Sequence, residues 1–348
     1  MINRKNSDLQ NQIEQLLTPI LEGEPGMIIM ARFDNGVIYQ AQKGFANITQ
    51  KQLINENSVF NLASVSKQFT AFSILLLAQE GKLSLDDSIL TYLPELGDYA
   101  KDITINSLIF HISGLIDYME LAFERGITYT TPLTPEESFA DIVRQTRTYY
   151  PIDSKFEYNN TGYFLLSQII ERVSQKPFSA FAQERIFSPL QMNDTFIVEQ
   201  YPTVNPIVSG YAKDEQGKYQ LSESPWTQTG DGAVHSSASD LMKWGENFNT
   251  ANVGGVALIT KMTQPFSNLT RKGKPVIDYE AYGFGLFINH TLGEIIFEHS
   301  GGWMGTSTHF MRIPQSKLTI TVLSNRENEE IDLVATEVAK ILLNKQVS

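Results

Sequence analysis

The chain of 348 residues contains no cysteine. This absence excludes disulfides, thiol nucleophiles and cysteine-ligated zinc sites, and it leaves the redox compartment open. Long apolar runs are also missing, so no segment reaches the length that spans a membrane and no signal peptide is visible after residues 1–7. We therefore expect a cytoplasmic protein if the chain is full length, and a periplasmic or secreted one if a leader has been removed.

Basic residues are the second shortage. The chain has 27 Lys and Arg against 39 Asp and Glu, which gives a formal net charge of −12 with no block of like charge. Such a balance disfavours nucleic acid and anionic membrane surfaces as partners. The hydrophobic share of 42% is enough for a large core, in one big domain or two closely packed ones. The oligomeric state is left open.

Two common catalytic patterns are absent as well. No Gly-x-Ser-x-Gly occurs, which disfavours an α/β-hydrolase. The five histidines, at 111, 235, 290, 299 and 309, show no spacing typical of a zinc site. We expect no metal and no cofactor.

Periodicity predicts mixed structure at both ends of the chain. Helical spacing covers residues 8–22, and two strands over 27–33 and 37–41 are joined at Asp34-Asn35-Gly36, a strong hairpin signal. A helix that is apolar all round follows over 65–80 and stops at Gly81. Towards the other end, the capping box Ser237–Asp240 predicts a helix to about Phe248. Beyond it we expect strands over 282–289, 294–298, 308–312 and 317–324, and a last helix over 331–343.

The middle of the chain is mainly helical, with helices expected over 107–110, 136–147, 161–173 and 178–186, and residues 201–235 are loop-rich. These patterns predict a mixed α/β domain built from residues 1–81 and 205–348, with a mainly helical domain inserted over 82–204.

The candidate chemistry begins with Ser64 and Lys67, three residues apart at the start of the apolar helix. Lys67 lies one helical turn beyond Ser64 on the same face and could take the proton of its hydroxyl. The same Ser-x-x-Lys pattern is also expected of a serine that caps a helix and is followed by a solvated lysine. A solvated lysine is unusual at the start of so apolar a helix, which favours the Ser-x-x-Lys nucleophile.

Two further motifs could complete an acyl-transfer site. Tyr158-Asn159-Asn160 lies on a loop before a helix, where Tyr158 could move protons, although a helix-start Asn cluster beside a packed Tyr has the same pattern. His299-Ser300-Gly301-Gly302 is expected to end the strand 294–298, where its glycines would let a substrate backbone lie close, or would only make a tight bend.

Together, Ser64-x-x-Lys67, Tyr158-x-Asn160 and His299-Ser300-Gly301 resemble the three motifs of the serine β-lactamase and penicillin-binding-protein superfamily, and most closely its class C β-lactamase-related branch. The stretches 108–115 and 230–241 are similar to the same branch, so the resemblance covers about residues 25–340. It implies an α+β fold of the β-lactamase/transpeptidase type, with an antiparallel sheet flanked by helices.

The resemblance also implies a mechanism. Ser64 would form an acyl-enzyme, and Lys67 and Tyr158 would share the role of base. Either residue could supply that base, because burial favours a neutral Lys67 whereas a cationic Lys67 favours a Tyr158 phenolate. Asn160 would hold Lys67 and the substrate amide, and the backbone N–H groups of Ser64 and Gly302 would bind the oxyanion.

The third motif departs from the pattern of class C β-lactamases. Those enzymes have Lys-Thr-Gly where this chain has His299-Ser300-Gly301. His299 is mostly neutral at pH 7, unlike a lysine that can attract a substrate carboxylate, which weakens the case for an efficient β-lactamase. A histidine at this position of the third motif resembles the pattern of D-Ala-D-Ala carboxypeptidases, D-aminopeptidases and some esterases of the family. His111 is expected to be a buried hydrogen-bonding residue beside the site.

We therefore expect a serine hydrolase that acts on a small-molecule or short-peptide substrate, as a peptide, amide or ester. A weak β-lactamase and a catalytically idle penicillin-binding scaffold are the alternatives. Trp226 and Asp231 precede the capped helix and could line the substrate cleft or serve only the loop.

Overall fold

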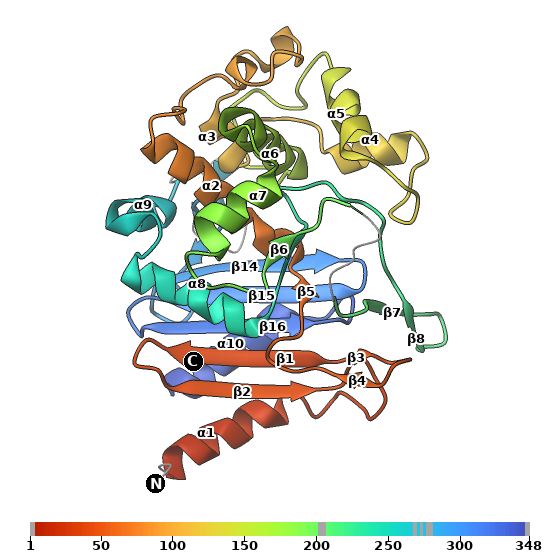
Figure 1. The fold of residues 1–348 in the computed structure, drawn as a ribbon, viewed down its shortest axis with the longest axis vertical. Coiled ribbons are helices and arrows are strands. Elements are labelled where there is room, and N and C mark those ends of the chain that lie inside the picture. Colours follow the sequence, from red (N-terminus) through yellow and green to blue (C-terminus); the bar gives the residue numbers. More distant parts are fainter. Residues whose placement is uncertain (1–3, 201–206, 267–269, 272–273, 276–280, 345–348) are drawn as a thin grey trace.

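The computed structural model of the chain describes residues 4–200, 207–266, 270–271, 274–275 and 281–344. Its centre is a seven-stranded antiparallel sheet with the order β12-β13-β14-β15-β16-β1-β2 (Figure 1). The strands are β1 (Met27–Phe33), β2 (Ile38–Lys43), β12 (Ala281–Tyr282), β13 (Phe287–Asn289), β14 (Ile296–Trp303), β15 (Thr306–Ile313) and β16 (Leu318–Ser324). Because β1 pairs with β16, the two ends of the chain share one sheet, as the sequence predicts.

The hairpin between β1 and β2 forms where the turn signal predicts it. The backbone N–H of Phe33 donates to the carbonyl of Val37 at 2.9 Å, and Gly36 has a φ of +90°, which side-chain-bearing residues rarely adopt. Residues 27–31 of β1 are all buried, because helices cover both faces of the sheet.

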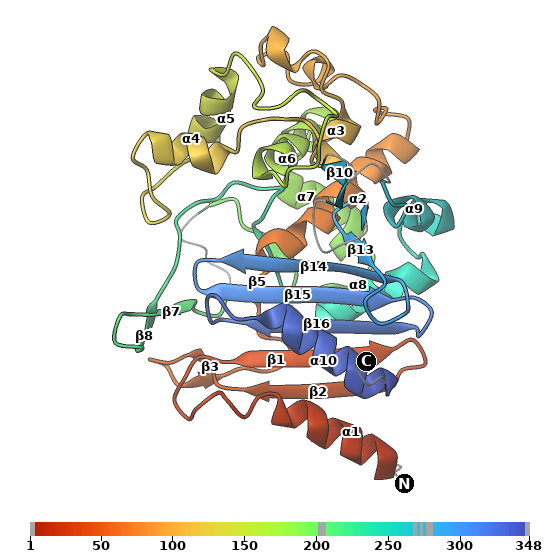
Figure 2. The same ribbon diagram turned by 180° about the vertical axis from the view of Figure 1, so that it is seen from behind.

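Helices cover both faces of the sheet. α1 (Arg4–Gln15) and α10 (Ile331–Leu343) pack on one face, and α8 (Ala238–Thr250) packs against β1 and β16 on the other (Figures 1 and 2). The α1/α10 face has a hydrophobic core of its own, which includes Ile29, Ile320 and Val338. A larger core lies on the α8 face and continues into the helical layer.

The helical layer lies beyond the β14 side of the sheet in Figure 1. It contains α2 (Lys67–Gln79), α3 (Ile105–Ile109), α4 (Tyr118–Glu124), α5 (Pro135–Val143), α6 (Asn160–Ser174), α7 (Phe178–Ala182) and α9 (Gly255–Met262). Short turns accompany them, namely the 3₁₀ turns η1 (Ala63–Ser66), η2 (Ile89–Thr91) and η3 (Asp98–Ala100) and the π-helical turn η4 (Gln183–Phe187). None of the helices in the described ranges is both long and apolar enough to cross a bilayer.

Small sheets connect the layers. They are formed by β3 (Phe45–Asn47) with β4 (Gln52–Leu53), by β5 (Phe60–Asn61) and β6 (Phe196–Ile197) on either side of β9 (Val234–Ser236), by β7 (Tyr211–Lys213) with β8 (Tyr219–Leu221), and by β10 (Thr270–Arg271) with β11 (Lys274–Pro275).

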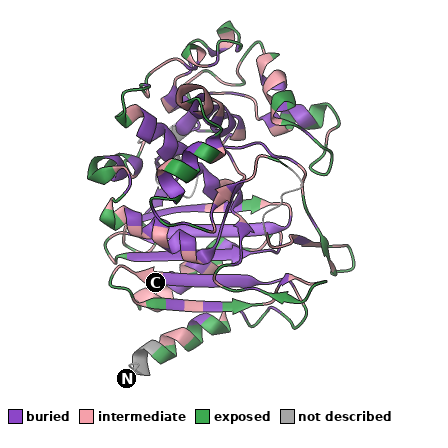
Figure 3. Cartoon of the chain, viewed as in Figure 1, coloured by how far each residue is buried: buried purple, intermediate pink, exposed green. Residues whose placement is uncertain are grey.

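α2 is the buried helix that the sequence predicts. Its residues from Lys67 to Leu77 are all buried, which Figure 3 shows as a purple helix inside the molecule. It ends one residue before Glu80, and Gly81 follows with a φ of +69°. One hydrophobic core joins α2, the sheet and the other helices. The predicted domain boundaries at residues 81/82 and 204/205 stay a prediction.

Several predicted boundaries are wrong. The first helix spans Arg4–Gln15 rather than 8–22. The single strand predicted over 282–289 is broken into β12 and β13, because the chain turns at Gly285 with a φ of +76°. The predicted helices 136–147 and 178–186 are shorter, and the second ends in η4. Helices α4 and α9 and the β7–β8 hairpin were not predicted.

The Gly-rich motif does not end its strand. His299 to Gly302 lie inside β14, which continues to Trp303 and pairs with β15 from Phe297 to Trp303. Of the capping box predicted at Ser237, one of the two hydrogen bonds is present. The Ser237 hydroxyl accepts from the Asp240 N–H at 3.2 Å, but the Asp240 carboxylate accepts instead from the N–H of Asp194 at 2.7 Å and from Thr195.

Candidate active site

The candidate nucleophile lies on a constrained turn. Ser64 is half-buried in η1, between β5 and α2, and the preceding Ala63 has a φ of +47°. The Asn61 side chain accepts from the Ala63 N–H at 2.8 Å, and the Thr308 hydroxyl donates to the Leu62 carbonyl at 2.8 Å. The turn is therefore fastened to β15 and held in a backbone conformation that residues other than glycine rarely adopt.

Lys67 is fully buried behind Ser64. Its ammonium nitrogen donates to Ser64 Oγ at 3.0 Å, Asn160 Oδ1 at 2.9 Å and the Asp231 carbonyl at 2.9 Å. Burial lowers the pKa of Lys67 to about 8, and the negative charges of Asp231 and Asp117 oppose that shift. Once neutral, the amine has a lone pair that can take the Ser64 proton.

Tyr158 lies on the loop that precedes α6 and lines the same space. Its ring stacks on that of His111, with centroids 4.5 Å apart, and Lys67 Nζ lies 4.8 Å from the Tyr158 ring centre. The buried Tyr158 hydroxyl has no hydrogen-bond partner among the described residues. Burial raises the pKa of Tyr158 well above 10, and the Ser64 side chain offsets only part of the rise. The phenol therefore keeps its proton at neutral pH.

The orientation of Asn160 depends on Asp117, which the sequence analysis missed. Asp117 Oδ2 accepts from the Asn160 backbone N–H at 2.7 Å and from its Nδ2 at 3.1 Å, while Asp117 Oδ1 caps α4. These bonds direct the amide oxygen of Asn160 at Lys67. The only local signal for Asp117 was its place before a short helix, which fits an ordinary N-cap.

The histidines beside Tyr158 are both neutral. His111 is buried, and its Nδ1 accepts from the Asn159 N–H at 3.0 Å, as expected for a hydrogen-bonding residue near the site. His299 lies on β14, and burial together with the charge of Lys67 lowers its pKa to about 3. Its Nδ1 lies 2.6 Å from the Ser300 carbonyl and its Nε2 lies 3.3 Å from the Tyr282 hydroxyl. His299 therefore brings no positive charge to the site.

The glycines of β14 lie against the nucleophile turn. A Cβ placed on Gly301 would stand 2.2 Å from the Leu62 carbonyl oxygen and 3.1 Å from the Ser64 nitrogen. Gly302 is open, since a Cβ there would meet nothing within 4 Å. Ser64 and Gly302 both line the cavity described next, whereas His299, Ser300 and Gly301 do not.

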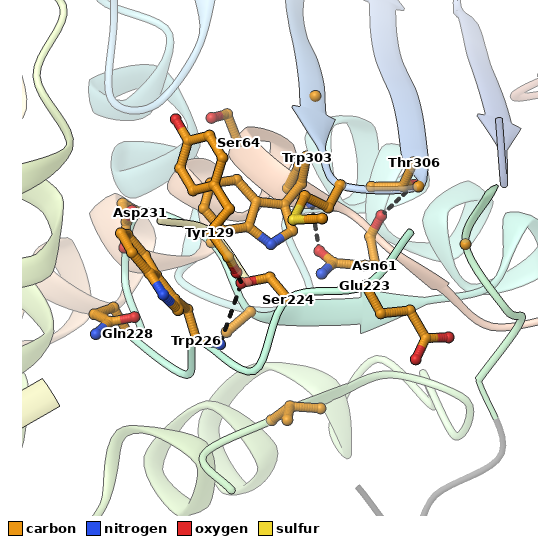
Figure 4. Close-up of a pocket in the computed structure, with 18 of the residues that line it drawn as sticks. Asn61, Ser64, Tyr129, Glu223, Ser224, Trp226, Gln228, Asp231, Trp303 and Thr306 are labelled. Carbon is orange, nitrogen blue, oxygen red and sulfur yellow. Dashed lines mark hydrogen bonds between the residues drawn. The ribbon is translucent and has the colours of Figure 1, made fainter. Parts of the chain in front are cut away.

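A cavity of about 570 Å³ opens in front of Ser64 (Figure 4). Its lining includes Tyr158, Asn160, Trp226 and Asp231, so both residues of the loop 226–231 that the sequence offered as cleft candidates do lie there. Rings form one wall of it, with centroids 5.9 Å apart between Trp226 and Trp303, 5.4 Å between Tyr129 and Trp226, and 4.9 Å between Tyr129 and Trp303. Tyr129 and Trp303 were not predicted.

Asp231 contacts Lys67 through its backbone and not through its carboxyl group. Its backbone carbonyl holds Lys67, and its side-chain Oδ2 accepts from the Tyr118 hydroxyl at 2.9 Å. Burial raises the pKa of Asp231 to about 7 against the opposing effect of Lys67. Over the ranges that the structure describes, no three His, Asp or Glu side chains gather in a way that could hold a metal ion.

The chain has clear relatives among known proteins. A family model described as Beta-lactamase matches residues 13–343. Penicillin-binding protein 4* of Bacillus subtilis (strain 168) is 30% identical over 320 residues, which cover 86% of this chain and 68% of that protein. A D-aminopeptidase of Gluconobacter oxydans (strain 621H) is 23% identical over 304 residues, 86% of this chain, and the chain spans 56% of its length.

The fold has a counterpart in a solved structure, that of the octameric penicillin-binding protein homologue from Pyrococcus abyssi. It matches with a TM-score of 0.83 at 27% identity, over 98% of this chain and 78% of that one. The class is thus the serine β-lactamase and penicillin-binding-protein superfamily, whose fold this chain has. The chain belongs to the Beta-lactamase family.

Proposed function

We propose that the protein is a serine acyl-hydrolase that forms an acyl-enzyme on Ser64 and acts on small peptide, amide or ester substrates. The observation that carries this proposal is the position of Lys67, which is fully buried within 3.0 Å of Ser64 Oγ. A buried lysine without a function is costly, because its charge is separated from water. Its cost is understandable if the neutral amine is needed as a base.

The reaction would begin when neutral Lys67 takes the proton of Ser64. The Ser64 oxygen attacks the substrate carbonyl carbon, and the backbone N–H groups of Ser64 and Gly302 hold the oxyanion. Tyr158, still protonated, gives its proton to the leaving nitrogen or oxygen as the bond to carbon breaks. The proton on Lys67 then passes to the Tyr158 oxygen, which restores both groups.

Deacylation would run through the same groups in reverse. Neutral Lys67 takes the Tyr158 proton as the Tyr158 oxygen takes one from water, and the resulting hydroxide attacks the acyl carbon. The Ser64 oxygen then leaves and receives the proton held on Lys67, which restores both groups. Asn160, fixed by Asp117, keeps the lysine pointed at Ser64 throughout both half-reactions.

The test is covalent labelling with a fluorescent fluorophosphonate and with a fluorescent penicillin. We expect wild type to be labelled on the peptide that carries Ser64 and Ser64→Ala to be unlabelled, with the same unfolding temperature. A panel of a short-chain nitrophenyl ester, a D-Ala-D-Ala peptide, a D-amino-acid amide and a chromogenic cephalosporin then sorts esterase, carboxypeptidase, aminopeptidase and β-lactamase activity. Absence of labelling in wild type would indicate an idle scaffold, and labelling that survives in Ser64→Ala would refute the assignment.

A further inference from the structure

His111 has a backbone conformation that is usually found in glycine. It follows Phe110, the residue that ends α3, and its φ is +56°. The His111 N–H donates to the Leu108 carbonyl at 3.3 Å, and the Ile112 N–H donates to the Ser107 carbonyl at 3.0 Å, which is the Schellman motif of a helix C-terminus. Because residues with a side chain are strained at this φ, a histidine here indicates that its side chain is needed.

His111 holds the chain on both sides of Tyr158. Its backbone carbonyl accepts from the Glu157 N–H at 2.8 Å, and its Nδ1 accepts from the Asn159 N–H at 3.0 Å. Between these two bonds the His111 ring stacks on the Tyr158 ring, with the centroids 4.5 Å and the planes 30° apart. One histidine thus fixes three consecutive residues of the loop, and Tyr158 is the middle one.

The protonation of His111 suits this contact. A ring nitrogen that accepts from a backbone N–H carries no proton, so the neutral ring has its proton on Nε2. Burial, and to a lesser extent the charge of Lys67, lowers the pKa of His111 well below 6.5, so the Nδ1 lone pair stays available at neutral pH. The buried Nε2 has no partner among the described residues, although buried polar groups are normally paired. The ring is therefore oriented for the bond at Nδ1 and not for one at Nε2.

The Tyr158 hydroxyl has no anchor of its own in the part of the chain that the structure describes. It is buried there without a hydrogen-bond partner. The ring has other neighbours, since its centroid lies 6.3 Å from that of Phe287, 6.0 Å from that of His299 and 4.8 Å from Lys67 Nζ. These contacts do not bond the hydroxyl. Its position therefore depends on the backbone at 157–159 and on the packing of the ring.

We propose that His111 is a positioning residue for Tyr158. It keeps the Tyr158 hydroxyl beside Ser64 through its bonds to the residues on either side of the tyrosine and through its contact with the ring. The inference rests on the proposed function, in which that hydroxyl gives its proton to the leaving group. His111 takes no proton itself, because the Asn159 N–H occupies its lone pair, and it acts on the reaction only through Tyr158.

The experiment compares phenyl acetate with p-nitrophenyl acetate, two esters that give the same acetyl-enzyme and differ in their leaving group. Phenoxide is the more basic of the two leaving groups, so its release depends more on a proton from Tyr158. For both esters kcat/KM reports acylation, whichever step limits kcat. The ratio of the two kcat/KM values therefore measures how well Tyr158 donates its proton.

Two substitutions of His111 are compatible with its positive φ, and only one of them keeps an acceptor. His111→Asn retains a side-chain oxygen near the place of Nδ1, and we expect it to stay within about threefold of wild type on both esters. His111→Gly loses the bond and the ring contact, and we expect it to lower kcat/KM about tenfold for phenyl acetate but less than about threefold for p-nitrophenyl acetate. Gln175→Gly is the matched control for the glycine itself, because Gln175 is exposed at the end of α6 with a φ of +58°, and it should stay within about twofold on both esters.

A double-mutant cycle separates positioning from a general loss of structure. In Tyr158→Phe the hydroxyl is gone, so adding His111→Gly should change kcat/KM for phenyl acetate by less than about twofold. A merely structural effect of His111→Gly would lower kcat/KM by the same factor with and without the hydroxyl. As a check on wild type alone, nitrogen NMR spectra of the histidine-labelled protein should show His111 protonated at Nε2 and not at Nδ1.

The possible outcomes separate the two proposals. A wild type that neither hydrolyses the esters nor is labelled on Ser64 refutes the proposed function. An active wild type whose folded His111→Gly variant keeps the ratio of the two esters, or loses the same factor with and without the Tyr158 hydroxyl, refutes the positioning role alone. A proton on His111 Nδ1 in wild type refutes that role as well, and this measurement decides the matter if His111→Gly does not fold or Tyr158→Phe is too slow to assay.

Discussion

Gly301 is the position at which the smallest change should have the largest effect. In Gly301→Ala, the new methyl group would stand 2.2 Å from the Leu62 carbonyl oxygen, 2.4 Å from Thr308 Oγ1 and 3.1 Å from the Ser64 nitrogen. The first of these contacts must open by about 1 Å before it becomes tolerable. The atoms that the methyl group meets belong to the nucleophile turn and to β15, and the methyl group itself lies on β14. The movement therefore separates Ser64 from the strand that bears Gly302.

The expected cost follows from that movement. Overpacking of this kind destabilises a protein by about 1–3 kcal/mol. A displacement of about 1 Å between reacting groups lowers the rate about 100-fold. We therefore expect Gly301→Ala to lower the unfolding temperature and to slow acylation by p-nitrophenyl acetate about 100-fold, measured as the burst rate in stopped flow.

The neighbouring glycine supplies the control for stability. A methyl group on Gly302 meets nothing within 4 Å, so Gly302→Ala should change the unfolding free energy by less than about 0.5 kcal/mol. Neither glycine has a positive φ, so backbone strain does not separate the two variants. The reasoning fails if Gly301→Ala unfolds and acylates like wild type, or if both variants are destabilised equally.

Four further predictions concern the groups around Lys67. Tyr158→Phe should slow acylation and deacylation while the unfolding temperature stays within a few degrees, and wild-type rates in both steps would remove Tyr158 from the proton path. The acylation rate should rise with pH and level off above about 8, since only neutral Lys67 is a base and its pKa is lowered to about 8. In Asp231→Asn the midpoint should move to lower pH, because the lost carboxylate no longer raises that pKa, and an unchanged or higher midpoint in the pH profile of kcat/KM contradicts this. Asp117→Ala should reduce kcat about tenfold by releasing Asn160 and lower stability by about 1 kcal/mol through the lost cap of α4, whereas Asp117→Ser should recover most of the stability alone.

The sequence predicted what local patterns determine. The spacing of Ser64 and Lys67, the apolar helix behind them and the Asp34–Gly36 hairpin all depend on neighbours along the chain, and the structure contains the helix and the hairpin. The last helix was predicted with its observed bounds, because its amphipathic pattern is uninterrupted.

What the sequence could not predict was set by tertiary contacts. Two glycines suggested that the strand ends at Glu298, but pairing with β15 carries β14 on to Trp303. The acceptors of Lys67 come from positions 160 and 231, and no local pattern indicates that a backbone carbonyl of a distant loop will be one of them. Tyr129 and Trp303 are in contact on the wall of the cavity, where the loop 129–133 is bonded to the segment 224–228.

The order of strands in the sheet has a consequence for how the protein is made. The ribosome synthesises β1 and β2 long before β16, yet β1 pairs with β16. Ser64 is synthesised long before Gly301, so a nascent chain carries the serine without the strand that completes its surroundings. Pairing of such distant segments is slow and cannot begin until the C-terminal strands are free of the ribosome. We therefore expect the Ser64 hydroxyl to become reactive only once β14 is in place, and a chain truncated before β14 to be inert toward acylating reagents.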